Sequence, residues 1–212
     1  AAPANTRVFS LTHRLHLTQP QAYIFDPELP YWIIYRNQLF DSVCRKLDFD
    51  VFEVFRDRQL TNKLLSSSGE LRVLKSRNLS DDGKEILDIP GYDSYISYAA
   101  AKPLSVFQYL DAPNVYLTPN MTYKPRMMKK PPHCVVNGSL AILIPKGGIV
   151  PTEKQLAYFS SEEYRAFYQI ARNFQTRSLN VDACSVFFYG LLRDEAKPAP
   201  EKFDTSVQLS FL

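Results

Sequence analysis

The order of short strand-like and helix-like runs is the feature that most constrains how this chain can fold. Strand patterns outnumber helical ones, yet they lack the regular alternation with helices that a doubly wound parallel sheet requires. The runs are bounded by turn signals such as Asp81-Asp82-Gly83 and the hairpin-like Asn137-Gly138. The sequence therefore predicts an α+β fold, in which a mixed or antiparallel twisted sheet packs with a few helices.

The first 50 residues are expected to supply a strand and a helix that pack on the rest of the domain. Residues 7–17 alternate well enough to predict one strand, which ends at Gln19-Pro20. From Pro30 onward, apolar residues recur near helical spacing, and proline is tolerated in a first helical turn, so a helix is predicted there. Further strands are expected at residues 51–60, 70–78, 114–117, 139–144 and 183–192.

The clearest helical pattern covers residues 160–174. Ser160 and Glu163 have the spacing of a capping box, and apolar residues follow at helical intervals. The opposite face carries Arg165 and Arg172. The pattern predicts a helix with one face in the core and a charged face outside.

Length and composition predict one globular domain followed by a tail. A chain of 212 residues with 45% hydrophobic residues can bury a substantial core. Residues 1–192 are interpreted as that domain, whereas residues 193–212 have the proline and charge content of a loose tail or linker. No apolar run approaches the roughly 20 residues of a membrane span and no signal-peptide pattern is present, so we expect a cytoplasmic protein with no membrane partner.

Cysteine and histidine give no indication of a metal site. Cys44, Cys134 and Cys184 are an odd number with no short paired spacing, which favours small buried residues over a disulfide framework or a zinc site. His13 and His16 would lie on opposite sides of a strand, so they could not act together as ligands. We therefore predict no bound metal.

The residue patterns of common catalytic sites are missing. Neither Asn137-Gly138-Ser139 nor Lys146-Gly147-Gly148 fits the glycine-rich turn that holds a dinucleotide or S-adenosylmethionine between a strand and a helix. Lys130-Pro131-Pro132-His133 is the nearest string to the base-flipping motif of amino-methyltransferases, but a lysine cannot accept a hydrogen bond from adenine. We predict no catalytic residue and no cofactor in this chain. A nuclease stays open as an alternative, because Thr152-Glu153-Lys154 contains the order acid-x-Lys.

Positive residues are clustered, although the net charge is only +3. A protein that only wrapped nucleic acid would usually be more basic, so the distribution of charge says more than its total. A shared face would give the molecule a positive side, and the alternative is a solvated surface of mixed charge. The four basic stretches are Arg56, Arg58 and Lys63; Arg72, Lys75 and Arg77; Lys124, Arg126, Lys129 and Lys130; and Arg165, Arg172 and Arg177.

Three stretches carry a resemblance to a known family. Residues 55–62 (FRDRQLTN), 70–83 (ELRVLKSRNLSDDG) and 89–96 (IPGYDSYI) resemble the carboxy-terminal target-recognition region of adenine-specific DNA methyltransferases from type II restriction-modification systems. They resemble more distantly a recognition domain of type I specificity subunits. The likeness extends to residues 120–126, 136–143 and 171–190.

The resemblance implies a sequence-specific reader of double-stranded DNA. It implies that the parent enzyme binds S-adenosylmethionine and methylates adenine at N6, whereas the cofactor fold with its catalytic tetrapeptide is not in this chain. The chain is then an isolated domain, or a separate subunit that works with a methyltransferase catalytic domain. The alternatives are a restriction endonuclease, a specificity subunit of a multi-subunit complex, and a protein-interaction domain.

Candidate base contacts lie where a predicted strand gives way to a loop. Arg56, Arg58, Gln59 and Asn62 combine fork-shaped donors with amides that suit adenine, and Lys63 stands beside them. We predict base readout there first.

Other polar side chains beside turns are candidates for contacts with phosphates or base edges. The next choices for base readout are Arg72, Lys75, Ser76, Arg77 and Asn78. Phosphate contact is predicted for Tyr123, Lys124, Arg126, Lys129 and Lys130. Second-rank contacts, which could instead satisfy a helix end, are Arg172, Asn173, Gln175, Thr176, Arg177, Ser178 and Asn180.

Overall fold

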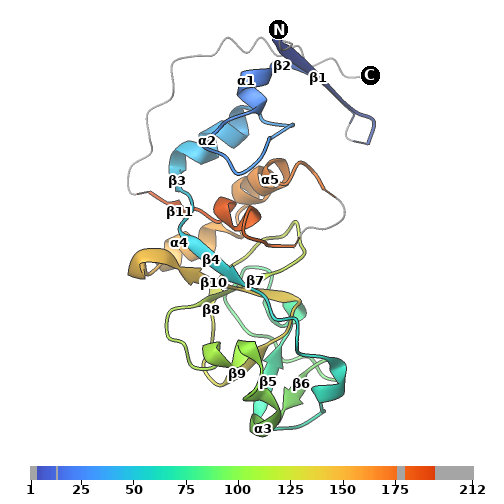
Figure 1. Cartoon of the computed structure of the whole chain (residues 1–212), viewed down its shortest axis with the longest axis vertical. Coiled ribbons are helices and arrows are strands. Elements are labelled where there is room, and N and C mark those ends of the chain that lie inside the picture. Colours follow the sequence, from blue (N-terminus) through green and yellow to red (C-terminus); the bar gives the residue numbers. More distant parts are fainter. Residues whose placement is uncertain (1–3, 13, 176–179, 194–212) are drawn as a thin grey trace.

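The computed structural model describes residues 4–12, 14–175 and 180–193. The molecule is elongated, with a hairpin at one end, helices and a central sheet in the middle, and a smaller sheet at the opposite end (Figure 1). Helices and several small sheets together make an α+β fold, as the sequence predicts.

Four antiparallel strands form the central sheet. Their order is β4 (Phe52–Phe55), β10 (Leu140–Pro145), β7 (Tyr116–Pro119) and β8 (Met128–Lys129). β10 pairs with a neighbour on each side, which confirms the buried strand predicted at residues 139–144. The strands predicted at residues 51–60 and 114–117 correspond to β4 and β7 with shifted ends.

The alternation of side chains along β10 divides the interior into two cores. Ala141 and Leu143 belong to a core covered by helices, whereas Leu140 and Ile142 belong to a second core on the other face. All four residues are almost fully buried. The central sheet therefore separates a helical side from a side built of smaller strands.

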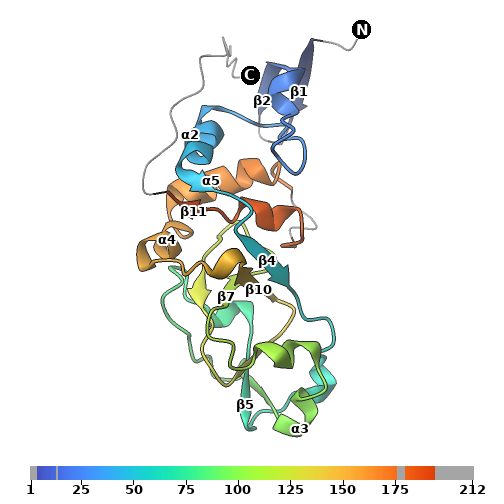
Figure 2. The same cartoon turned by 60° about the vertical axis from the view of Figure 1, so that its left-hand side comes forward.

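Aromatic rings fill the core between the sheet and helices α2 (Gln38–Lys46) and α5 (Glu162–Ala171). Phe40 of α2 stacks on Phe167 of α5 with ring centroids 5.0 Å apart, and Phe188 packs edge-on against both rings. The two helices lie side by side in both views (Figures 1 and 2). Removal of one such buried ring costs about 3–5 kcal/mol, so this core stabilises the domain strongly.

Helix α5 confirms the helix predicted at residues 160–174, but its cap differs from the prediction. Ser161, rather than Ser160, is the N-cap, and its hydroxyl accepts a hydrogen bond from the Tyr164 N–H over 3.1 Å. The helix ends at Ala171, and Asn173 and Phe174 then adopt positive φ angles of 48° and 50°. Such left-handed residues cannot continue a right-handed helix.

The second core lies under a three-stranded sheet. Its order is β6 (Ser94–Ile96), β5 (Leu71–Leu74) and β9 (Cys134–Val136). β5 pairs antiparallel with β6 and parallel with β9, so this sheet is mixed. Helix α3 (Tyr98–Ala101) and the 3-10 helix η3 (Ser105–Tyr109) contribute buried residues to the same core.

The amino-terminal segment is a hairpin rather than the single strand predicted for residues 7–17. β1 (Asn5–Ser10) and β2 (Leu15–Pro20) pair antiparallel along their whole lengths, and the short helix α1 (Gln21–Ile24) follows. The sequence between the strands, residues 11–14, has none of the glycine, proline or asparagine signals that mark a turn. The alternation of apolar and polar residues therefore did not indicate that the chain reverses direction here.

The helix predicted from Pro30 is shorter than expected. Asn37 is the N-cap of α2, and its side-chain oxygen accepts a hydrogen bond from the Phe40 N–H over 3.0 Å. The preceding residues form a loop, in which the Ile33 N–H donates to the Ile24 carbonyl over 3.2 Å. Tertiary hydrogen bonds override the helical spacing of apolar residues in this loop.

The strand predicted at residues 183–192 is wrong over most of its length. The structure has a 3-10 helix, η5 (Ser185–Phe188), and then a two-residue strand, β11 (Leu191–Leu192), which pairs with β3 (Leu47–Asp48). The carboxylate of Asp182 accepts hydrogen bonds from two N–H groups of the following turn. This local turn prevents the aromatic run from extending as a strand.

Cys184 departs from the prediction of small buried cysteines because it is exposed, whereas Cys44 and Cys134 are half-buried. All three thiols are free. Burial raises the pKa of the Cys44 thiol to about 12 and also raises the pKa of Cys134.

The tail predicted at residues 193–212 lies outside the described residues, apart from Arg193. Arg193 forms an ion pair with Asp48 over 2.7 Å. Of the helices in the described part of the chain, none has the length and apolar character that crossing a membrane requires.

Candidate nucleic-acid interface

Three strand ends of the central sheet meet at one edge. β4 and β7 run in the same direction and end where the antiparallel β10 begins, with Leu140 opposite Pro119. The loops that follow β4 and β7 therefore meet the loop that precedes β10. We call this edge, with Arg56, Asn120 and residues 137–139, the strand-end junction.

Asn120 links the loops of the strand-end junction. Its side-chain nitrogen donates to the Gly138 carbonyl and to Asn180 Oδ1, each over 3.0 Å. Its side-chain oxygen accepts from the Val181 N–H over 3.0 Å and from Arg56 over 3.4 Å. Asn120 is only 6% exposed, so its amide ties together segments that are far apart in the sequence.

The turn at Asn137-Gly138 does not form the predicted hairpin. β9 before the turn pairs with β5, whereas β10 after it pairs in the central sheet, so the chain crosses between two sheets here. A Cβ on Gly138 would lie 2.7 Å from the Asp57 carbonyl oxygen, which is too close for a side chain, so only glycine fits at this position. The crossing therefore places residue 57 directly against the junction.

Asp57 holds the loop that carries the first set of candidates. Its carboxylate accepts a hydrogen bond from the Leu60 N–H over 2.8 Å, and the residue is 6% exposed. Its neighbours Arg58 and Gln59 are exposed. The side-chain oxygen of Gln59 is engaged by the N–H and hydroxyl of Ser105 at 2.7 and 2.9 Å. Arg58 is therefore the better placed of the two for an outside contact.

The end of β5 adjoins the same junction. The Asn137 N–H donates to the Leu74 carbonyl over 3.1 Å, and the Ser76 N–H donates to the Ser139 hydroxyl over 2.9 Å. The candidates that follow β5 are thereby fixed beside those that follow β4.

The strand predicted at residues 70–78 stops at Leu74 because a 3-10 turn, η2 (Ser76–Asn78), follows it. The Asn78 side-chain oxygen accepts a hydrogen bond from the Lys75 N–H over 2.9 Å, which caps this turn. Asn78 is fully buried, so its amide supports the loop and is closed to DNA.

Arg72 is engaged by two acids of the segment that precedes β6. Its guanidinium pairs with Asp88 over 2.6 Å and with Asp93 over 2.9 Å. Asn78 and the Ile89 N–H donate to Asp93 over 2.6 and 3.0 Å. Burial acts to raise the pKa of Asp93, but the hydrogen bonds from Ile89 and Asn78 and the charge of Arg72 outweigh it and lower that pKa.

Two cations lie against the ring of Tyr92. Lys75 Nζ is 3.9 Å from the ring centroid, and the guanidinium carbon of Arg77 is 4.6 Å from it. Lys75 also donates to the Tyr92 carbonyl and to the Ser94 hydroxyl. Burial and the charge of Arg77 lower the pKa of Lys75, against the opposing charge of Asp93.

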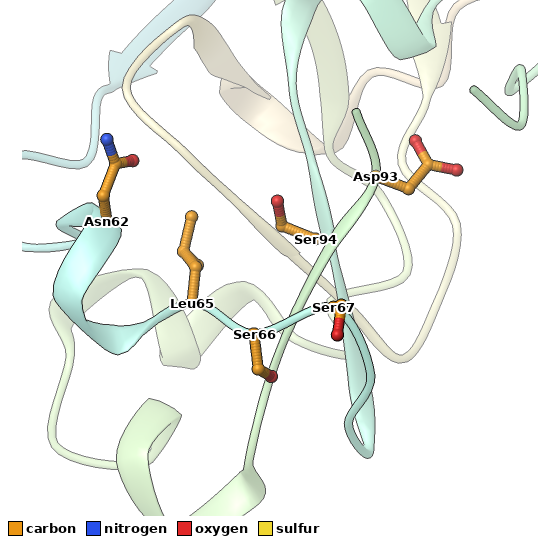
Figure 3. A pocket seen from close by; sticks show the side chains of 6 residues that line it. All are labelled: Asn62, Leu65, Ser66, Ser67, Asp93 and Ser94. Atoms are coloured by element: carbon orange, nitrogen blue, oxygen red, sulfur yellow. The ribbon is translucent and has the colours of Figure 1, made fainter. Parts of the chain in front are cut away.

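A shallow pocket of about 330 Å³ lies beside Lys75, because Ser94 lines the pocket and accepts a hydrogen bond from the Lys75 ammonium. Asn62 and Leu65 extend from the turn η1 (Asn62–Leu64) and its C-cap on the opposite side (Figure 3). The other lining residues are Ser66, Ser67 and Asp93.

Arg126 and Lys130, which the sequence offered as phosphate contacts, are buried with exposures of 8% and 4%. Arg126 donates to the carbonyls of Ser76 and Leu79 over 3.1 and 3.2 Å. Lys130 donates to the Leu110 carbonyl over 2.8 Å. Burial lowers the pKa of both side chains. Backbone carbonyls use these charges inside the protein, so we do not retain them as DNA contacts.

Arg172 and Tyr123, two candidates near the carboxyl end of α5, make hydrogen bonds within the protein. Arg172 is 4% exposed and donates to the Asn180 carbonyl over 3.3 Å. The Tyr123 hydroxyl donates to the Gln175 carbonyl, and burial raises its pKa to about 12. The candidates Thr176, Arg177 and Ser178 lie outside the described residues.

The remaining cations do not all lie at the strand-end junction. Lys129 pairs with Tyr116, the first residue of β7, and so lies away from the strand-end junction. Among the described members of the four basic stretches, several bind backbone carbonyls or acids within the protein, so these residues do not form one continuous positive face. Seven candidates are exposed, and their side chains form no hydrogen bond or ion pair within the described residues: Arg58, Asn62, Lys63, Arg77, Lys124, Lys129 and Gln175.

Sequence reasoning did not single out Tyr92 or Asn120. Tyr92 lies in a turn that the sequence marks only by Gly91 and Asp93, and its neighbours in space follow a different strand. Asn120 was visible only as a polar residue after Pro119. Its position directly after the buried strand β7 was the sequence signal that could have indicated its role in linking the loops.

The nuclease alternative lacks the strand that it needs. Glu153 and Lys154 lie in the first turn of α4 (Glu153–Tyr158), which Thr152 caps and which follows the 3-10 turn η4 (Lys146–Gly148). Within residues 4–12, 14–175 and 180–193, no group of three His, Cys, Asp or Glu side chains could hold a metal ion.

Comparisons with protein-family models, curated proteins and solved structures return no match to this chain.

Proposed function

We propose that this chain binds one double-stranded DNA sequence and acts as the target-recognition module of an adenine-N6 DNA methyltransferase in a restriction-modification system. One observation carries the DNA-binding part: Arg58, Asn62 and Arg77 expose side-chain donors beside loops that hydrogen bonds of the buried residues Asp57 and Asn78 hold in place. The methyltransferase context rests on the resemblance of residues 55–62 and 70–83.

Fixed loops suit base readout because the donors need little ordering when they bind. Arg58 follows Asp57, whose carboxylate holds the loop, and Asn62 begins the turn η1. Less conformational entropy is lost on association, so more of the contact energy appears as affinity. A bidentate contact of arginine or asparagine with the correct base is worth about 1–3 kcal/mol.

Exposed lysines near these loops suit contacts with the DNA backbone. Lys63 directly follows Asn62, and Lys124 lies in the loop after Asn120. Phosphate contacts of this kind set the register of a protein on DNA without reading the sequence. They also make the affinity fall steeply as salt rises, since bound counterions are released.

The catalytic steps belong to a partner in this proposal. A methyltransferase catalytic domain or subunit binds S-adenosylmethionine and transfers the methyl group, while this chain selects the site. The chain itself then needs no cofactor and works in the cytoplasm.

Selection from a randomised duplex pool at two salt concentrations tests the proposal. We expect one sequence to be enriched, with an affinity that falls steeply as salt rises. Incubation of the selected duplex with magnesium checks for strand scission, which would support the endonuclease alternative instead. A pool that yields no enriched sequence would overturn the proposal.

Substitution of Arg58 tests the assignment of base readout. Arg58→Ala should reduce discrimination at one position of the enriched sequence by about 1–3 kcal/mol while leaving the unfolding midpoint unchanged. Arg7→Ala is the matched control, because Arg7 is also exposed but lies on β1 at the far end of the molecule (Figure 1). Equal discrimination by the two variants would remove Arg58 from the reading surface.

A further inference from the structure

Two positive side chains lie against the ring of Tyr92, and the acid that acts on one of them, Asp93, is already engaged by other groups. Lys75 Nζ and the Arg77 guanidinium carbon lie 3.9 and 4.6 Å from the ring centroid. Asp93 acts electrostatically on Lys75, but Arg72 and Asn78 engage its two carboxylate oxygens. The charge of Arg77 also acts on Lys75, so the two cations repel each other, and an added anion would relieve that repulsion.

The hydrogen-bond donors of both cations are partly or wholly unused. An ammonium has three N–H bonds, and Lys75 directs two hydrogen bonds to the Tyr92 carbonyl and the Ser94 hydroxyl. The exposed guanidinium of Arg77 makes no hydrogen bond within the described residues. Its planar fork matches the oxygens of a phosphate, whereas the compact charge of lysine suits an anion at any orientation.

We propose that Lys75, Tyr92 and Arg77 form a clamp for one backbone phosphate of the bound DNA, an inference that rests on the proposed function. A phosphate carries a full negative charge, whereas base edges are neutral, so the electrostatic gain at two adjacent cations favours the phosphate. This assignment replaces the base readout that the sequence suggested for Lys75 and Arg77. Base readout is then left to Arg58 and Asn62.

Buried contacts hold the clamp in place before DNA arrives. Asn78 caps the turn of Arg77 through the Lys75 N–H and also donates to Asp93 over 2.6 Å. Asp93 directly follows Tyr92 and pairs with Arg72 over 2.9 Å. The turn that carries the cations and the turn that carries the ring are therefore joined by one hydrogen-bonded network, so little ordering remains for the binding step.

Affinities of the full chain for several duplexes, measured over a series of salt concentrations, test the clamp. Arg77→Gln should lower the affinity for the enriched duplex and for unrelated duplexes by the same factor. It should also reduce the slope of log affinity against log salt by about one. The control Arg7→Gln should change neither quantity.

Substitutions of Tyr92 separate the ring from its hydroxyl. Tyr92→Phe keeps the ring against both cations and should bind DNA as the unaltered chain does. Tyr92→Leu keeps an apolar side chain without the ring and should weaken binding to all duplexes alike. Thermal unfolding of both variants checks that the fold is retained, and a Tyr92→Phe variant as weak as Tyr92→Leu would contradict a role for the ring.

A scan with neutral methylphosphonate linkages locates the phosphate. Replacing one phosphate at a time should weaken binding at one position for the unaltered chain, and Arg77→Gln should be insensitive at that position. If no position distinguishes the two proteins, or if Arg77→Gln changes the preferred sequence without changing the salt slope, the clamp is overturned while the proposed function stands. If the unaltered chain binds no duplex at all, both proposals are overturned.

Discussion

Two arginines at the turn η2 make opposite kinds of contact: Arg126, the inner arginine, binds within the protein, and Arg77, the outer arginine, faces outward. Arg126 is 8% exposed and donates to the carbonyls of Ser76, the first residue of η2, and Leu79, which follows η2. Arg77, within that turn, is exposed and rests on the ring of Tyr92. The Leu79 carbonyl is buried at the end of the turn, and the buried arginine supplies a donor to it.

Clustered charge in a sequence does not by itself identify a binding surface. Buried carbonyls and acids engage Arg72, Lys130 and Arg172, although all three belong to basic stretches. Arg58 and Arg77 come from the same stretches and remain exposed. A loop-rich domain needs internal donors as well as external ones, and both are supplied by basic residues.

The largest effect on stability is expected from replacing Arg126, the inner arginine. Arg126→Leu keeps much of the side-chain volume but removes the donor to the buried Leu79 carbonyl and the hydrogen bonds to the carbonyls of Ser76 and Lys124, so the free energy of unfolding should fall by about 2–4 kcal/mol. Urea denaturation measures this loss. Arg77→Leu, the matched change at the outer position, should stay within about 0.5 kcal/mol of the unaltered chain. Equal losses at the two positions would show that burial does not separate their roles.

Two asparagines extend the same comparison with an intermediate effect. Asn120→Ala removes the amide that joins Gly138, Asn180 and Val181, and should destabilise the chain by about 1–3 kcal/mol. Asn62→Ala removes an exposed amide and should leave the unfolding midpoint unchanged while altering base preference. Thermal melts and duplex selection measure the two outcomes. A stable Asn120→Ala variant would argue against its linking role.

The smallest effect is expected from the pH dependence of Asp93. Because its pKa is lower in the folded chain than in the unfolded chain, Asp93 contributes stability above the ordinary aspartate pKa of about 3.9. That contribution is lost as the pH falls from about 5 through the lowered folded pKa.

Urea denaturation between about pH 6 and pH 3 measures this dependence, and Asp93→Asn should flatten it. Asp88→Asn is the matched control, since it removes the exposed partner of the same arginine and a surface ion pair contributes little. A curve for Asp93→Asn with the slope of the unaltered chain would contradict the stabilising role of Asp93.

Part of the fold was predictable from residues that act locally. The strand at residues 139–144 and the helix around Tyr164 were predicted because continuous burial and helical spacing are strong local patterns. The turn within residues 11–14 and the cap at Asn37 were missed, since the first lacks turn residues and the second competes with an apolar pattern that continues through it.

The candidate surface was predictable only as a list of residues. Arg58, Asn62 and Arg77 were selected as polar side chains beside turns, and the structure finds them exposed. Lys130 and Asn78 were selected by the same reasoning and are buried. Residue type indicates what a side chain can bind, whereas its burial depends on which backbone groups approach it from elsewhere in the chain.

Local sequence patterns were enough to predict the α+β class, the main buried strand and the basic residues available for contacts with anions. Which of those basic residues face outward depends on the folded arrangement of the chain. Arg77 meets Tyr92 because β5 and β6 pair, and Asn120 meets Gly138 because β7 and β10 pair. Both contacts depend on the long-range pairing of strands, which the local pattern of residues around each position does not specify.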